Sequence, residues 1–143
     1  MGTTYTVKAY PDRWTSKKYL QSQITRELTN LTETLSTYDN SSELSKWNNS
    51  RSTDWEVISD DLFKVIYKAK QVFFISKGAF DPTVKPLSDL WGFSQKSRTY
   101  EIPNKDMIAR AMAKLGFNKV DIAFGHKLRK KEAMLRLDLS GLA

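Results

Sequence analysis

The chain has 143 residues, of which 40% are hydrophobic, 27% charged and 12% aromatic. That length suits one domain with a modest core, and so many large apolar side chains exclude a disordered chain. No cysteine is present, which excludes disulfides, thiolate zinc sites and a cysteine nucleophile within these residues. The single histidine, His126, cannot form a histidine-rich metal site by itself, and we expect it at the surface.

The net charge of +7 attracts polyanions, so nucleic acid, an acidic membrane and a phosphorylated ligand are all candidate partners. Most of the excess lies late in the chain and includes the run KLRKK at 127–131. Such runs usually lie on solvated faces, so charge alone does not choose among these partners. No stretch approaches the roughly 18 apolar residues of a membrane span.

The first half of the chain predicts one strand followed by two helices. Residues 4–10 alternate and are rich in Tyr, Thr and Val, which favours a strand. Between 16 and 35 the apolar residues recur at helical spacing, which predicts an amphipathic helix. A turn-prone loop at 36–40 precedes a short helix capped by Ser42, and 48–53 is typical of a polar linker.

The second half predicts two further helices and two strands. A helix over 60–76 begins at Ser59 as N-cap and ends before Gly78. Residues 79–84 are expected to be extended, because the residue before a proline avoids the helical region. A helix over 105–115, capped by Asn104, precedes strands at 117–124 and 133–139, with the basic run in the turn between them. Strands at both ends with helices between them indicate a mixed α/β, or α+β, domain.

Three places could carry chemistry, and each has a plain structural alternative. The loop at 77–86 combines glycine, aspartate and prolines in a stiff segment, which is also typical of an ordinary helix-to-strand connection. Residues 138–141 (DLSG) offer a carboxylate, a hydroxyl and a glycine, which suit a polar ligand or a hard cation but also a simple turn. Tyr38 could face a flat aromatic ligand or be a half-buried structural residue.

Five segments, taken together and in order, resemble the ApbE family of FAD:protein FMN transferases. They are MGTTY at 1–5, LSTY with SELSKWN at 35–38 and 42–48, GAFDPTV with PL and LWGF at 78–84, 86–87 and 90–93, VD at 120–121, and LDLSGLA at 137–143. The likeness covers the whole chain. The long central segment carries most of its specificity.

The resemblance implies an ApbE-like (T-fold-like) domain in which helices pack on a mostly antiparallel sheet. It also implies an enzyme that binds FAD, cleaves its pyrophosphate with magnesium and transfers FMN to a Thr or Ser of a target protein. Targets in the family are subunits of membrane redox complexes. Members are commonly lipoproteins of the bacterial periplasm or cell envelope, anchored at the inner membrane.

Family positions also map onto particular residues of this sequence. Those matching FAD contacts are Met1, Tyr38, Ala79, Phe80, Asp81 and Asp138. Gly141 matches a magnesium contact made through its backbone carbonyl. Tyr38 would offer an aromatic face to the flavin ring, and Met1 a pliable apolar contact.

The departures from the family pattern concern completeness. The family's export signal, its lipobox cysteine, the lysine after its DLSGIA motif and its later magnesium ligands have no counterpart in residues 1–143. We therefore expect the N-terminal part of one ApbE-like domain, truncated and inactive alone, with catalytic residues in the missing half and any membrane contact made through an anchor not in this chain. Unpaired strand edges could also promote self-association.

Two kinds of alternative function remain. One is a non-catalytic flavin-binding protein or FAD pyrophosphatase of the same family, and the other is a basic nucleic-acid-binding module. We expect no nucleic-acid partner, because no aromatic residues interleave with the basic run.

Overall fold

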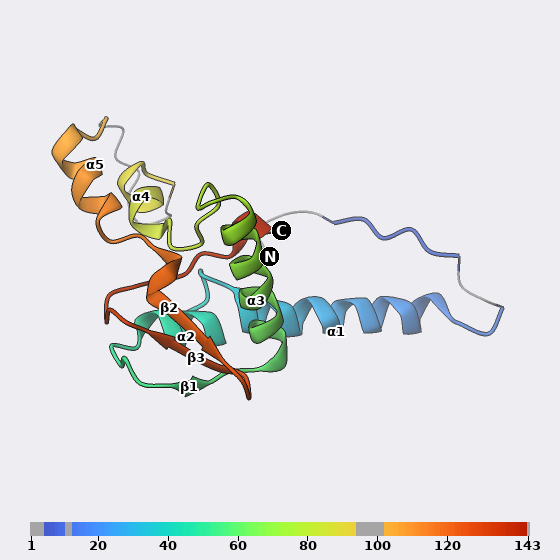
Figure 1. The fold of residues 1–143 in the computed structure, drawn as a ribbon. Helices are drawn as coiled ribbons and strands as arrows, with labels where there is room; N and C mark the ends of the chain where they lie inside the picture. The colour runs from blue at the N-terminus through green and yellow to red at the C-terminus, as the bar shows by residue number, and fades with distance from the viewer. Residues whose placement is uncertain (1–4, 11–12, 94–101, 143) are drawn as a thin grey trace.

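The computed structural model describes residues 5–10, 13–93 and 102–142 (Figure 1). Within those ranges the elements, in chain order, are α1 (Lys17–Leu35), α2 (Glu43–Asn49), β1 (Glu56–Val57), α3 (Asp60–Ile75), α4 (Lys85–Leu90), α5 (Lys105–Met112), the 3₁₀ turn η1 (Phe117–Lys119), β2 (Val120–Ala123), β3 (Lys127–Lys130) and the 3₁₀ turn η2 (Ser140–Leu142). The sheet has the order β1-β3-β2, and both strand pairs are antiparallel. The expected α+β class with an antiparallel sheet is confirmed.

Side-chain caps fix where four of the helices begin. Ser16, Ser42, Ser59 and Asn104 each accept a hydrogen bond from the backbone N–H three residues ahead. Such a bond satisfies an N–H group that the helix itself leaves without a partner, and is worth about 1 kcal/mol. The predicted caps at Ser42, Ser59 and Asn104 are therefore confirmed.

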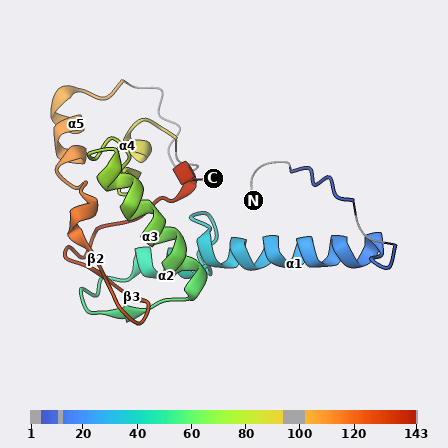
Figure 2. The same cartoon turned by 45° about the vertical axis from the view of Figure 1, so that its right-hand side comes forward.

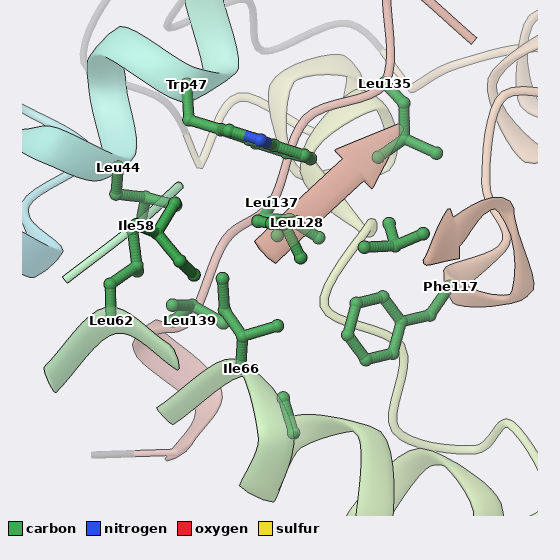
Figure 3. Packing of buried hydrophobic residues seen from close by; sticks show 12 residues of the cluster. Leu44, Trp47, Ile58, Leu62, Ile66, Phe117, Leu128, Leu135, Leu137 and Leu139 are labelled. Carbon is green, nitrogen blue, oxygen red and sulfur yellow. The ribbon is translucent and has the colours of Figure 1, made fainter. Parts of the chain in front are cut away.

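One apolar cluster joins α2, α3, the sheet and the segment at 135–139 (Figure 3). Leu137 and Leu128 lie in the middle of this cluster, with Trp47 on one side and Ile66 on the other. Leu135, Leu137 and Leu139 are all buried, whereas the residues between them are not. The last stretch of chain before η2 is therefore part of the core.

The remaining helices lie at the two ends of this core (Figures 1 and 2). α1 projects from the body, contacts it through its C-terminal end, and has no buried residue. α4 and α5 pack against each other at the opposite end. Among the described residues no helix combines the length and the apolar character needed to cross a membrane.

The strand predictions needed the largest corrections. Residues 5–10 form no strand and are exposed; Thr4, the first residue of that prediction, lies outside the described ranges. The basic run predicted as a turn is strand β3 with Lys131 following it, while the strand predicted at 117–124 is confined to Val120–Ala123. Residues 133–139 pair with no strand among the described residues; Leu137 bonds instead to the Asn48 side chain, and Asp138 to the Pro82 carbonyl oxygen.

Several loop predictions were also wrong. Residues 81–84 form a turn and not an extended segment, and Val84 (φ −60°, ψ −10°) leads directly into α4, which the sequence did not predict. The two-residue strand β1 was likewise missed, and Asn48 and Asn49, expected in a linker, end α2. α5 ends at Met112 rather than at residue 115. Gly78 adopts a left-handed conformation (φ 84°) after α3, as predicted.

Candidate functional site

Two of the three candidate segments lie side by side. The backbone N–H of Asp138 donates to the carbonyl oxygen of Pro82 at 2.7 Å. A Cβ placed on Gly141 would lie 3.3 Å from the ring of Phe80, so Gly141 lies directly against that half-buried aromatic side chain. The loop that follows α3 and the segment that enters η2 therefore form one surface.

Asp81 shapes the first of these segments. Its Oδ1 accepts hydrogen bonds from the backbone N–H of Thr83 at 2.8 Å and from the Thr83 hydroxyl at 2.6 Å. Thr83 is buried, and its Oγ1 in turn accepts from the N–H of Gly116 at 2.8 Å. The loop is thereby fixed to the chain between α5 and β2, while Ala79 stays exposed.

Asp138 shapes the second segment in the same way. Its Oδ1 accepts from the N–H of Ser140 at 3.0 Å and from the Ser140 hydroxyl at 2.5 Å. Gly141 follows in η2 and is exposed, so its backbone is accessible from outside. No donor among the described residues bonds to the other carboxylate oxygen, Asp138 Oδ2.

Tyr38 lies in the turn between α1 and α2 and is 67% exposed. The hydroxyls of Ser42 and Ser45 both donate to the carbonyl oxygen of Ser36, at 2.5 and 2.9 Å, and hold this turn on α2. The turn begins directly after Leu35, which packs on the same core cluster as Phe80 and Leu142. The Tyr38 ring is therefore accessible to a ligand, while the backbone of its turn is held in place.

The turn at Tyr38 contains a third aspartate with the same pattern. Asp39 Oδ1 accepts from the N–H and the hydroxyl of Ser41, at 2.8 and 2.7 Å. These bonds lower the pKa of the Asp39 carboxyl below its usual value. Asp-x-Ser/Thr turns therefore occur at 39–41, 81–83 and 138–140, in all three described segments that the resemblance assigns to FAD.

This repeated spacing was the signal that sequence reasoning did not use. Each segment was interpreted alone: residues 36–40 as a turn-prone loop, 79–84 as extended, and 138–141 as a polar-ligand or cation site or a simple turn. The structure shows that each triplet locks one carboxylate oxygen and leaves the other free of donors among the described residues. Met1, the remaining predicted contact, lies outside the described ranges.

The basic run is less available for a partner than its sequence suggests. Lys130 is buried, and its ammonium donates to two backbone carbonyl oxygens. Arg129 and Lys131 both pair with Asp121, at 2.6 and 3.1 Å, and the Arg129 guanidinium lies 4.6 Å from the centre of the Trp55 ring. Three of the four basic residues of the run are thus engaged within the fold.

Hard oxygen donors are present at the candidate site, but few. The Asp138 carboxylate and the exposed Gly141 backbone suit magnesium, which prefers oxygen ligands and commonly takes only one or two carboxylates beside substrate phosphates. The part of the chain that the structure describes contains no cluster of three or more His, Cys, Asp or Glu residues arranged to hold a metal ion. These residues fit a magnesium ion shared with a phosphate ligand and do not form an all-protein cage.

Solved structures of flavin transferases share this fold. The flavin transferase ApbE from Vibrio cholerae superposes with a TM-score of 0.85 at 31% identity, over 92% of this chain and 42% of the other. The apo form of the Pseudomonas stutzeri flavinyl transferase ApbE gives a TM-score of 0.84 at 30% identity, over 94% and 43%. The fold is thus that of part of a flavin transferase.

The model of the ApbE family matches residues 1–143, and the chain belongs to that family. Curated relatives named FAD:protein FMN transferase include those of Vibrio cholerae, 33% identical over 144 residues, and Haemophilus influenzae, 33% identical over 150. The alignments cover all of this chain and 43% of each relative. The chain therefore spans less than half the length of the curated relatives that it matches.

Proposed function

We propose that this chain supplies one wall of the FAD site of an FAD:protein FMN transferase. The observation that carries the proposal is the convergence of the segments at Asp81 and Asp138, each with one carboxylate oxygen fixed and one free. Free acceptor oxygens on the two segments that meet where Gly141 contacts Phe80 suit a ligand with an aromatic face and N–H or O–H donors, as FAD has.

The transfer places the FMN phosphorus on the hydroxyl oxygen of a Thr or Ser of a target protein. The new P–O bond forms as the P–O bond to AMP in the pyrophosphate breaks; AMP leaves, and the hydroxyl proton is lost. Phosphoryl transfer depends mainly on positioning and charge stabilisation, so no nucleophile triad is required of this chain. The chain's part is to hold and orient the dinucleotide.

Magnesium belongs to the same proposal. Asp138 and the backbone carbonyl of Gly141 would hold it, and when bound it would offset phosphate charge as a Lewis acid. Flavin-accepting subunits of membrane redox complexes as targets, and a location in the bacterial periplasm or cell envelope, are further parts of the proposal. They rest on the family resemblance.

The test is a titration of FAD into the purified chain, with and without magnesium, with FMN and AMP as comparators. We expect saturable quenching of flavin fluorescence and a preference for FAD over FMN and AMP, because FAD carries both the flavin and the adenosine. The variant Asp138→Asn should weaken binding and remove most of the magnesium effect. Asp61→Asn, an exposed change in the first turn of α3, serves as the charge-matched control and should bind as the parent does.

Two results would contradict the proposal. If the folded chain binds no FAD in this titration, it does not form this part of the FAD site. Equal affinity for FAD in the Asp138→Asn and Asp61→Asn variants would place the ligand elsewhere on the chain.

A further inference from the structure

Asn48, at the end of α2, bonds to the backbone of the segment that carries Asp138. Its Nδ2 donates to the carbonyl oxygen of Leu137 at 2.8 Å, and its Oδ1 accepts from the N–H of Leu137 at 2.8 Å. One side-chain amide thus replaces the two hydrogen bonds that a neighbouring strand would make. Both residues are buried, so water is a poor substitute for either bond.

The end of α2 that carries Asn48 is itself held by the sheet. The buried ammonium of Lys130 donates to the carbonyl oxygens of Trp47 and Ser50, each at 2.7 Å. It also lies 4.4 Å from the centre of the Trp47 ring. A cation at this end of a helix is favourable, because the last carbonyl groups carry partial negative charge. Asn48 is therefore presented from a fixed turn.

The peptide unit between Leu137 and Asp138 is held from both sides. Its carbonyl oxygen, from Leu137, accepts from Asn48, and its N–H, from Asp138, donates to the carbonyl oxygen of Pro82 at 2.7 Å. Because a peptide unit is planar, these two bonds fix its orientation. That orientation determines the direction in which the chain leaves toward the Asp138 carboxylate and Gly141.

We propose that Asn48 is a positioning residue of the FAD site, acting through the Leu137–Asp138 peptide plane. This proposal rests on the proposed function. It assigns to α2 a role in ligand binding without any contact between Asn48 and the ligand. Loss of the Nδ2 donor should let the plane rotate and move the Asp138 carboxylate away from its position beside the loop at 80–82.

The variant Asn48→Asp tests this role, because it keeps the shape and the acceptor but loses the donor. Near about pH 8 the introduced carboxylate would face the Leu137 carbonyl oxygen, and we expect FAD to bind at least about tenfold more weakly than to the parent. Burial raises the pKa of a carboxyl group, so the introduced group should become protonated as the pH falls toward about 5. A protonated carboxyl can donate to Leu137 again, and the ratio of the two dissociation constants should then approach one.

Two control variants separate positioning from loss of stability. Asn48→Ala removes both bonds, so its weakened FAD affinity, relative to the parent, should not recover at low pH. Ser59→Ala removes the N-cap of α3, costs about 1 kcal/mol of stability and should leave FAD affinity unchanged. A pH-independent ratio for Asn48→Asp, or an equal loss of affinity in Ser59→Ala at matched stability, would overturn the proposal.

Amide hydrogen exchange without ligand distinguishes a failure of this inference from a failure of the proposed function. In Asn48→Asp at about pH 8 the Asp138 amide should exchange at least about tenfold faster than in the parent, while amides of β3 keep their protection. If the parent binds no FAD but this difference is seen, the proposed function fails and the effect of Asn48 on the peptide plane stands. Unchanged protection at Asp138 refutes that effect, whatever FAD does.

Discussion

Thr83 is the residue through which the candidate site is fixed to the rest of the fold. Its hydroxyl donates to Asp81 and accepts from the N–H of Gly116, at 2.6 and 2.8 Å. We expect Thr83→Val, which keeps the shape, to lower the free energy of unfolding by about 1–3 kcal/mol, because the Gly116 N–H loses its partner. Urea unfolding followed by tryptophan fluorescence measures this change.

The matched variant is Thr83→Ser, which keeps the hydroxyl. It should restore most of the stability lost in Thr83→Val, with a small deficit from the missing methyl group. If the valine variant were as stable as the parent, the two hydrogen bonds would contribute nothing net, and another contact would have to hold the loop.

Tyr38 offers an exposed ring in a turn that serine hydroxyls hold in place. Under the proposed function, Tyr38→Ala should weaken FAD binding by roughly 2- to 10-fold, the range expected of one aromatic contact of about 0.5–1.5 kcal/mol. Tyr38→Phe should bind as the parent does, because the ring is kept. Fluorescence titration gives both constants.

Tyr19, near the start of α1 and 60% exposed, gives the control for that experiment. Tyr19→Ala removes an exposed tyrosine from the projecting part of the helix and should leave FAD affinity unchanged. An equal effect of the two alanine variants would argue against a specific contact at Tyr38.

At the level of elements, the end of α2 depends on one buried lysine. Burial lowers the pKa of the Lys130 ammonium, which reflects the cost of removing that charge from water. Two carbonyl oxygens offset this cost, and both would lose a donor in Lys130→Met. We expect that variant to lose about 1–3 kcal/mol in thermal or urea unfolding.

Lys131→Met is the comparison, because it removes a half-exposed charge from the adjacent position. Its ion pair with Asp121 is worth about 0–1 kcal/mol, so the loss should be smaller than in Lys130→Met. If Lys130→Met were instead more stable than the parent, desolvation of the charge would outweigh the two hydrogen bonds.

The helices were largely predictable from sequence because their signals are local. Apolar spacing and a capping side chain lie within a few residues of the backbone that they organise, as at Ser42, Ser59 and Asn104. The α4 helix was missed because Asp81-Pro82-Thr83 was interpreted as extended, whereas the Asp81 carboxylate closes it into a turn.

The strand predictions failed because the hydrogen-bond partners of these segments are distant in the sequence. Residues 133–139 have the alternation of a strand, but the distant partners of their backbone are the Asn48 side chain and Pro82. The run at 127–131 was predicted to be a solvated turn, but Lys130 is buried and bonds to the carbonyl oxygens of Trp47 in α2 and of Ser50 just after it. No window of sequence contains both halves of such a contact.

The candidate site was predictable only in part, because its supporting residues are also distant in sequence. Tyr38, the loop at 79–81, Asp138 and Gly141 came from resemblance, and the structure places the last three together. Their supports, Asn48 and Thr83, lie in other segments and required the three-dimensional arrangement to be identified.

For the whole molecule, stability should fall in acid. Hydrogen bonding from Arg129, and then from Lys131, lowers the pKa of Asp121. The pKa values of Asp39 and Asp60 are also lowered from the usual 3.8. A carboxyl whose pKa is lower in the folded state stabilises the fold above its unfolded value, and that contribution is lost as the pH falls through the folded value. The free energy of unfolding should therefore decrease below about pH 4.

Asp121→Asn provides the test of that dependence. Urea unfolding at a series of acidic pH values should show a shallower decrease for the variant, because one of the contributing carboxyl groups is gone. Identical slopes for variant and parent would mean that Asp121 titrates alike in the folded and unfolded states.

The bonds between Asn48 and Leu137 join residues that are 89 positions apart. Closing a flexible loop of that length costs about 4 kcal/mol of chain entropy by the logarithmic estimate, so these contacts should form late in folding. At translation rates of about 5–20 residues per second, the segment that contains Leu137 is synthesised on the order of ten seconds after α2. During that interval the candidate site is incomplete, and the amide of Asn48, which the folded protein buries, can bond only to water.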